Sequence, residues 1–242
     1  MKISKPHALW IMVLSAIYTL NTTGQSIIAR LLGTINRPWV DKTLQLWAKR
    51  VLKLMKVKVK VINPDHVMPK KGQATIVMCN HSSLYDIPLS MRAFPHHSLR
   101  MLAKKELSKI PIVGKGMTAS EFPFIDRKNR RQAIKDLKAV HELLASGIVL
   151  WIAPEGTRSK DGKLAPFKKG GFITAIEAKA MIIPIGIRGA CNILPANTFQ
   201  FNTHQTAEIH IGKPIDASAY TLENKNELAD VVFKAMKALV EG

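Results

Sequence analysis

The feature that most constrains the fold is the apolar run Ala74–Cys79 together with the polar segment that follows it. β-branched residues dominate the run and turn-forming residues bound it, which is typical of a strand buried in a sheet. The polar segment contains His81 and, five residues later, Asp86. Five residues turn through about 500° on a helix, so these two side chains meet only if His81 lies on a turn and Asp86 on the helix that follows. The sequence therefore predicts a reactive site where a strand ends and a helix begins, as in α/β folds.

This pairing has two interpretations. A histidine oriented by a carboxylate is a general base that can take a proton from a hydroxyl near neutral pH. The alternative is a loop histidine that happens to lie beside a helix cap. His81 and Asp86 alone leave both interpretations open.

Strand-like and helix-like apolar patterns alternate along the rest of the chain. We expect strands at 57–61, 74–79, 99–103, 121–125, 148–153, 181–187 and 207–211, and helices at 37–56, 129–146, 170–179 and from 224 onward. This alternation predicts an α/β fold with a mixed, largely parallel sheet flanked by helices. A length of 242 residues suits one such domain, which we place at 57–242, with an appended element before it.

Residues 1–56 are expected to form that appended element, as membrane-anchoring helices. No Asp, Glu, Lys or Arg occurs between Lys5 and Arg30, and a bilayer needs roughly 20 such residues. The polar stretch Asn21–Gln25 interrupts this region, which therefore fits a half-inserted or bent hairpin as well as a spanning helix. A signal peptide is disfavoured because no clear cleavage site follows.

The segment Arg37–Lys56 predicts a basic amphipathic helix, because its apolar residues recur at helical spacing and lysines occupy the other surface. Tryptophans at its apolar edge suit a lipid interface. An ordinary helix packed on the domain is the alternative.

The charge of the chain favours an anionic partner. Thirty-six Lys and Arg against 17 Asp and Glu give a net charge of +19. Three of the four tryptophans, Trp10, Trp39 and Trp47, lie in the first fifth of the chain, which favours a membrane. No nucleic-acid-binding motif is present, so nucleic acid is the weaker candidate.

The two cysteines, Cys79 and Cys191, form no disulfide framework, and no metal-ligand spacing occurs. Reduced thiols and a cytosol-facing domain are therefore expected, with no metal. Cys79 is two residues from His81, near enough to be considered as a nucleophile, but a structural role is favoured because it continues a buried apolar run. The pattern Gly114-x-Gly116-x-x-Ala119 matches a dinucleotide fingerprint only by chance, since no suitable strand or acidic residue accompanies it.

A second polar segment, Pro154–Ser159, follows the strand expected at 148–153. Glycine lets a ligand approach the backbone, while a threonine hydroxyl and an arginine suit phosphate oxygens. Arg127, at the end of another expected strand, could converge on the same anion. In the alternative interpretation, Glu155 and Arg158 form a surface ion pair and Arg127 is solvated.

Four segments of the chain resemble, in the right order, the motifs of the glycerolipid acyltransferases, the family that includes bacterial lysophosphatidic acid acyltransferase. They are Asn80-His81-x4-Asp86, Phe124-Ile125-Asp126-Arg127, Pro154-Glu155-Gly156-Thr157-Arg158-Ser159 and Ile182-Ile183-Pro184-Ile185. The first pattern is short and weak alone, whereas four ordered segments are a strong signal.

The resemblance implies acyl transfer from a thioester to the sn-2 hydroxyl of 1-acylglycerol-3-phosphate. His81 would act as the general base and Asp86 would hold its tautomer. The residues expected to position the glycerol phosphate are Arg127, Glu155, Gly156, Thr157 and Arg158, with Lys105 as a further candidate. Because Glu155 is negative, orienting Arg158 or the substrate hydroxyl is its expected role.

The resemblance further implies acyl-CoA or acyl carrier protein as donor, no bound cofactor, and a location at the cytoplasmic side of a bacterial inner membrane. Two alternatives are kept. One is an acyltransferase for another lysolipid, such as a lyso-ornithine lipid; the other is a non-catalytic basic protein that binds membranes or nucleic acid.

Overall fold

The computed structural model describes residues 2–126, 128–159 and 161–242. Its centre is strand β2 (Thr75–Cys79), which is buried at every position. Seven strands of the described residues form the main sheet, in the order β1-β8-β7-β2-β6-β3 with β9 beside β7. The other strands are β1 (Lys58–Ile62), β3 (Leu99–Met101), β6 (Val149–Ile152), β7 (Met181–Arg188), β8 (Thr206–Ile211) and β9 (Ile215–Asp216).

The sheet is mixed and largely parallel, as predicted. β2 is parallel to both of its neighbours, β6 and β7, whereas β8 and β9 run antiparallel to β7. The strand expected at 121–125 is shorter and lies elsewhere. It is β5 (Phe124–Ile125), which pairs with β4 (Ala103–Lys104) in a separate two-stranded sheet.

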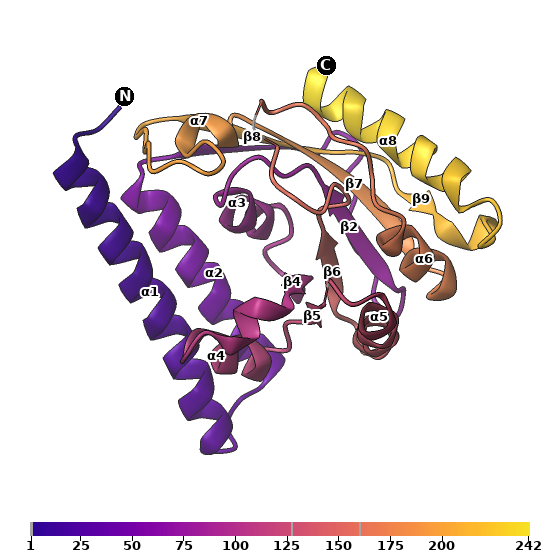
Figure 1. The fold of residues 1–242 in the computed structure, drawn as a ribbon, viewed down its shortest axis with the longest axis horizontal. Coiled ribbons are helices and arrows are strands. Elements are labelled where there is room, and N and C mark those ends of the chain that lie inside the picture. Colours follow the sequence, from indigo (N-terminus) through magenta and orange to yellow (C-terminus); the bar gives the residue numbers. More distant parts are fainter. Residues whose placement is uncertain (1, 127, 160) are drawn as a thin grey trace.

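Helices cover both faces of the main sheet (Figure 1). The helices on one face are α1 (Lys5–Leu31), α2 (Arg37–Leu54) and α3 (Asp86–Ala93), with the short α7 (Ala190–Ile193). Those on the other face are α5 (Arg130–Ala145), α6 (Gly170–Glu177) and α8 (Lys225–Glu241). The short α4 (Val113–Ala119) lies against α1, and two 3-10 turns, η1 (Lys105–Lys109) and η2 (Ala217–Ala219), complete the order.

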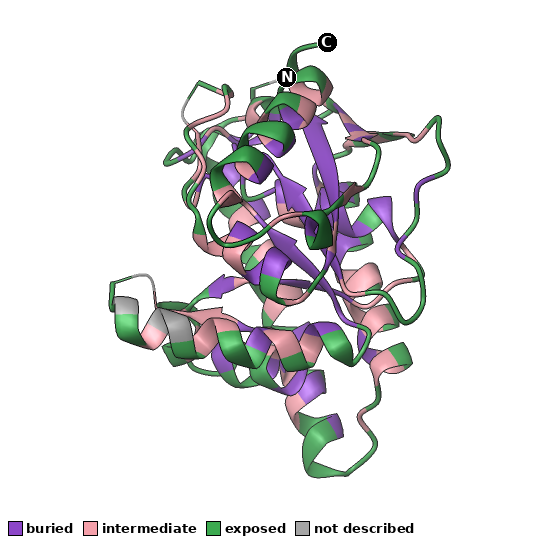
Figure 2. Cartoon of the chain, turned by 90° about the vertical axis from the view of Figure 1, so that its right-hand side faces the viewer, coloured by how far each residue is buried: buried purple, intermediate pink, exposed green. Residues whose placement is uncertain are grey.

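Alternate residues of β2 enter two different cores. Val77 and Cys79 pack with α1, α2 and α3, while Ile76 and Met78 pack with α5, α6 and α8. This is the period of two that a strand imposes on its side chains. The buried strands form the interior in Figure 2. Since β2 is covered on both faces, the groups that can meet a ligand lie beyond its carboxyl end, where the polar segment 80–86 begins.

Helix α1 is continuous through the polar stretch Asn21–Gln25, where a bend was one of the two expectations. The Thr19, Thr23 and Ser26 hydroxyls donate to carbonyls four residues earlier, so they are satisfied within the helix. The chain turns back only after Leu31, and α2 follows from Arg37 with Asn36 as its cap. The hairpin therefore consists of two complete helices.

The two faces of α1 are unusual in polarity. Thr22, Thr23 and Ser26 are among its buried residues, whereas many of its large apolar side chains are exposed. The exposed ones are Leu9, Trp10, Val13, Ile17, Leu20, Ile28 and Leu31. Within the described part of the chain, no helix combines the length and apolar character needed to cross a bilayer.

Candidate active site

The His81 and Asp86 side chains meet at the carboxyl end of β2. His81 lies on the loop after the strand and Asp86 is the first residue of α3, the arrangement that the five-residue offset requires. His81 Nδ1 lies 2.8 Å from Asp86 Oδ2. The imidazole is mostly covered, with 16% of its side chain exposed, and the carboxylate is fully buried.

Backbone donors fix the Asp86 carboxylate. Its Oδ2 atom accepts from the N–H groups of Ser82 at 2.7 Å and Ser83 at 2.8 Å. The Ser83 hydroxyl in turn donates to the carbonyl of Leu194 at 2.8 Å. A buried carboxylate held by two amides is a fixed acceptor, so His81 Nδ1–H donates to it and Nε2 is left to receive a proton.

The second polar segment lies beside the first because β6 and β2 are parallel neighbours. Glu155, three residues after β6, is only 2% exposed. Its two oxygens accept from backbone groups, Oε1 from His81 N–H and Oε2 from Ala165 N–H, each at 2.9 Å. Ser159 N–H donates to the His81 carbonyl at 2.7 Å, which completes a second link between the loops.

These contacts give Glu155 a different place from the one expected. The sequence suggested that Glu155 orients Arg158 or the substrate hydroxyl, but both oxygens bond to the backbone and one bonds to the loop that carries His81. Burial raises the pKa of Glu155, while the amide donors of Ala165 and His81 act in the opposite direction. Glu155 therefore holds the backbone of His81 in place and does not contact its imidazole through a hydrogen bond.

Two cationic side chains, Lys168 and Arg158, belong to the loop region around Gly156. Gly156 has a φ of 71°, a left-handed conformation that glycine adopts without strain. The side chain of Lys168 lies against it, since a Cβ at Gly156 would be 3.2 Å from Lys168 Nζ. Arg158 Nη2 donates to Asn197 Oδ1 at 3.3 Å, and both residues line the cavity described next.

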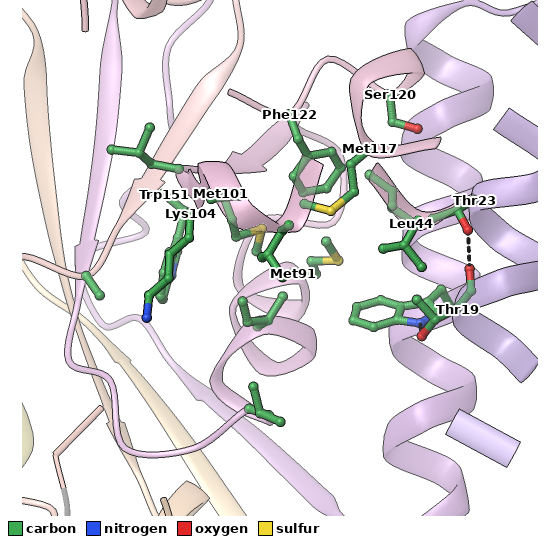
Figure 3. A pocket seen from close by; sticks show the side chains of 18 of the residues that line it. Thr19, Thr23, Leu44, Met91, Met101, Lys104, Met117, Ser120, Phe122 and Trp151 are labelled. Atoms are coloured by element: carbon green, nitrogen blue, oxygen red, sulfur yellow. Dashed lines mark hydrogen bonds between the residues drawn. The ribbon is translucent and has the colours of Figure 1, made fainter. Parts of the chain in front are cut away.

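An apolar cavity of about 460 Å³ begins at this cluster. His81, Gly156, Thr157, Arg158 and Lys104 line its polar end. Figure 3 shows Lys104 and Trp151 at one end and Thr19, Thr23 and Leu44 at the other. The side chains between the ends are mainly apolar and include Met91, Met101, Met117 and Phe122.

The inner end of the cavity is made by the N-terminal helices. Ser26 and Ser120 join α1 to the end of α4 through a hydroxyl–hydroxyl bond of 2.9 Å. Trp47 Nε1 on α2 donates to Thr19 Oγ1 on α1 at 3.1 Å. The cavity thus runs from the two loops at the sheet edge to the α1–α2 hairpin.

The structure brings most, but not all, of the expected residues together. His81, Asp86, Glu155, Gly156, Thr157 and Arg158 lie at the carboxyl ends of β2 and β6. Arg127 lies outside the described residues. Lys105 is half-buried in η1, and the cavity is lined by its neighbour Lys104 instead.

Sequence reasoning missed Lys104, Lys168 and Trp151. The edge of the His81 ring meets Trp151, with ring centroids 5.7 Å apart, and Trp151 Nε1 donates to the Ser90 hydroxyl at 2.8 Å. The first two are ordinary lysines in lysine pairs, and no local pattern separates them from solvated neighbours. The place of Trp151 near His81 follows from the pairing of β6 with β2, in which Trp151 lies opposite Val77, and the sequence does not contain that register.

Cys79 has the structural environment that its apolar run indicated. It is fully buried, and burial together with the charge of Asp86 raises the pKa of its thiol well above the usual range. A protonated thiol is a poor nucleophile. No group of three or more potential metal ligands occurs among the residues that the structure describes.

A strand-end histidine and carboxylate thus lie beside a cationic loop and an apolar cavity. The sequence model of the Acyltransferase family matches residues 58–188 of this chain, which is more than half of its length. The chain therefore belongs to the Acyltransferase family.

Two named relatives and one solved structure extend the comparison. The chain is 37% identical over 71% of its length to an uncharacterized acyltransferase of Schizosaccharomyces pombe, of which it covers 62%. It is 33% identical over 75% of its length to the 1-acyl-sn-glycerol-3-phosphate acyltransferase of Saccharomyces cerevisiae, of which it covers 60%.

The crystal structure of the 1-acyl-sn-glycerophosphate acyltransferase PlsC from Thermotoga maritima superposes with a TM-score of 0.79 at 27% identity, covering 96% of this chain and 92% of that one. The chain spans less than two thirds of the length of the two yeast relatives. The solved structure, in contrast, is matched over almost its whole length.

Proposed function

We propose that this protein transfers an acyl group from a thioester to the sn-2 hydroxyl of 1-acylglycerol-3-phosphate, forming phosphatidic acid. The observation that carries the proposal is the position of His81. It is fixed by Asp86 at one end of an apolar cavity, where Arg158 and Lys104 also line the wall. A phosphorylated lipid with one acyl chain and one free hydroxyl has the matching chemistry.

His81 acts as the general base. Its Nδ1–H donates to Asp86, so Nε2 accepts the proton of the acceptor hydroxyl as that oxygen attacks the thioester carbonyl. The carbon–sulfur bond then breaks, and the leaving sulfur takes the proton that His81 has held. The donor is released as the free thiol. Asp86 keeps the ring in one tautomer and stabilises the imidazolium.

The phosphate of the acceptor is bound by the cationic cluster. Arg158 presents a planar fork suited to phosphate oxygens, and Thr157 and the backbone at Gly156 lie beside it. Lys104 and Lys168 add ammonium groups near the same loop. Arg127 remains a candidate from the sequence alone.

An acyl chain occupies the apolar cavity. The lining changes from charged at His81 to aliphatic, aromatic and methionine side chains farther in, as the two ends of a lipid substrate require. The threonine hydroxyls at the inner end are bonded to their own helix and offer little to a polar ligand.

The protein works at a membrane, and the α1–α2 hairpin faces the lipid. The exposed apolar residues along α1 and the charge of +19 support this placement. The cytoplasmic face of a bacterial inner membrane suits the free thiols, and the donor is acyl-CoA or acyl carrier protein, both acidic.

The test is transfer of a radiolabelled acyl group to 1-acylglycerol-3-phosphate by the purified chain in detergent micelles, from acyl-CoA and from acyl carrier protein. The acceptor panel includes lysophosphatidylcholine, lyso-ornithine lipid and a 1-acylglycerol that has no phosphate. Preference for the phosphomonoester is expected. Equal use of the phosphate-free acceptor would refute the role given to Arg158, and full activity of His81→Ala would refute the mechanism.

A further inference from the structure

A second cleft lies on the opposite side of the α1–α4 contact from the catalytic cavity. It has a volume of about 510 Å³ and is lined by Ile27, Arg30, Leu31, Ser108, Lys115, Thr118 and Ala119. The catalytic cavity is lined by other residues of the same helices, including Thr22, Thr23 and Ser26 of α1 and Gly116 and Met117 of α4. The two helices therefore form a wall with a cavity on each side.

Two glycines of α4 allow the close contact between α4, α1 and η1. A Cβ at Gly116 would lie 2.4 Å from Thr23 Cβ, and a Cβ at Gly114 would lie 2.1 Å from the Ser108 carbonyl. Only glycine permits α4 to approach both α1 and η1 so closely. The G-x-G pattern therefore serves packing, and Lys115, between the two glycines, lines the second cleft.

The cleft is cationic. Among the described residues, neither the Arg30 guanidinium nor the Lys115 ammonium has a hydrogen bond or ion pair, and no acidic residue lines the cleft. The Ser108 and Thr118 hydroxyls donate to backbone carbonyls, so their oxygens remain available as acceptors only. Two unpaired cations in one recess are suited to a phosphate.

Apolar side chains flank the cleft on both sides. Ile28 and Leu31 of α1 are exposed to 58% and 81%, and Leu107, Ile110 and Ile112 around η1 are exposed as well. Figure 1 shows α4 beside the C-terminal half of α1, where these two groups of residues lie. Cations between exposed apolar residues are the pattern of a surface that meets lipid headgroups and the upper acyl region together.

We infer that the cleft between α1 and α4 binds the phosphate of an anionic membrane lipid through Arg30 and Lys115. It is a second lipid site, separate from the one that holds the acceptor. The inference rests on the proposed function in one respect, namely that the chain works at a bilayer surface. A soluble phosphate would need neither Leu31 nor the apolar residues around η1.

The test is co-sedimentation of the full chain with vesicles of phosphatidylcholine alone and vesicles that also contain phosphatidylglycerol, at one ionic strength. The variant is Arg30→Gln with Lys115→Gln. The matched control is Lys179→Gln with Lys234→Gln, which removes the same charge from the sheet face opposite α1. We expect about a 30-fold loss of binding to the anionic vesicles for the variant and less than about 3-fold for the control.

Two further arms define the site. Exchanging the cations as Arg30→Lys with Lys115→Arg should retain binding within a few-fold, whereas glycerol 3-phosphate added in solution should not displace the vesicles. The inference is overturned if the variant and the control lose equal binding, if soluble phosphate competes, or if the wild-type chain shows no preference for anionic vesicles.

Acyl transfer in detergent micelles separates this outcome from the proposed function, because it depends on His81 and not on the cleft. The double variant should retain that activity. Acyl-transfer activity in a wild-type chain that shows no preference for anionic vesicles would refute only the lipid site in the cleft. A preference for anionic vesicles in a chain without acyl-transfer activity would refute only the proposed reaction.

Discussion

The strand β2 has no charged residue, and the helix α1 has none between Lys5 and Arg30, yet the two stretches are buried to very different extents. β2 is buried at every position. α1 buries Thr22, Thr23 and Ser26 while Ile17 and Ile28 remain exposed. Apolar composition therefore predicts burial inside the protein for β2 but not for α1.

The difference follows from what covers each element. β2 has a hydrogen-bonded strand on each side and helices on both faces, so each of its side chains enters a protein core. α1 is covered on one side, where α2 and α4 approach it closely, and small residues suit that approach better than leucine. Most of its larger apolar side chains therefore remain exposed, with Ile11 as a buried exception.

The largest expected effect lies at the end of β2. His81→Ala should lower kcat for acyl transfer by about 10³-fold to 10⁴-fold, because it removes the general base. Its side chain is mostly covered but takes no part in the core, so the urea unfolding curve should move little. The measurement is transfer to 1-acylglycerol-3-phosphate beside equilibrium unfolding; a loss of activity matched by unfolding would assign His81 to stability.

One substitution in each element tests the difference in burial between β2 and α1. Ile76→Ala in β2 should lower the free energy of unfolding by about 2–5 kcal/mol, because it leaves a cavity in a closed core. Ile17→Ala in α1, where half of the side chain is exposed, should change it by less than about 0.5 kcal/mol. Both are measured by urea unfolding in detergent.

In a vesicle-binding assay, Ile17→Ala should have the larger effect of the two variants, the reverse of their order in stability. Ile17→Ala removes apolar surface from the proposed membrane face and should weaken vesicle binding, whereas folded Ile76→Ala should bind as the wild type does. Equal vesicle binding by both variants would contradict the outward role of α1.

Much of the fold could be predicted because period and turn residues are local. The strand at 75–79, the helix capped by Asn129 and the basic helix after Asn36 follow from such patterns. The sequence left open whether α1 is continuous or bent, since its continuity depends on hydroxyls that bond within the helix and on the packing of α4. The displacement of β5 from the main sheet also depends on contacts between distant segments.

The site was predictable where a motif carries it and not elsewhere. The meeting of His81 with Asp86 follows from their offset and from the strand end that precedes them. The position of Glu155 beneath His81 depends on the parallel register of β2 and β6, which the sequence does not contain. Lys168 contacts Gly156 across a loop, and no sequence spacing predicts such a contact.

A smaller effect is expected where α1 touches α4. Gly116→Ala should lower the free energy of unfolding by about 1–3 kcal/mol, because its Cβ would lie 2.4 Å from Thr23 Cβ. Gly24→Ala on the same helix pair is the matched control. A Cβ there meets nothing within 4 Å, so it should stabilise α1 by up to about 1 kcal/mol. Stabilisation by both substitutions would show that the α1–α4 contact is not tight.

The smallest effect concerns the carboxylate beneath the end of β2. Glu155→Gln should lower the free energy of unfolding by about 1 kcal/mol at neutral pH, because an amide offers one acceptor oxygen to the two N–H groups of His81 and Ala165. Urea unfolding at several pH values measures it. Glu223→Gln makes the same chemical change at an exposed position and is the matched control.

The pH dependence of this difference has a defined sign. Burial raises the pKa of Glu155 in the folded state, so its stabilising contribution is fully present below the unfolded value near 4.5 and is lost as pH rises through the folded pKa. The glutamine of the variant does not titrate. The stability advantage of the wild type over Glu155→Gln should therefore be larger in acid and shrink as the pH rises above about 4.5. An advantage that grows with pH instead would mean that the two backbone donors outweigh burial. The loops at the end of β2 would then stabilise a buried negative charge, whereas the strand itself is stabilised by apolar burial.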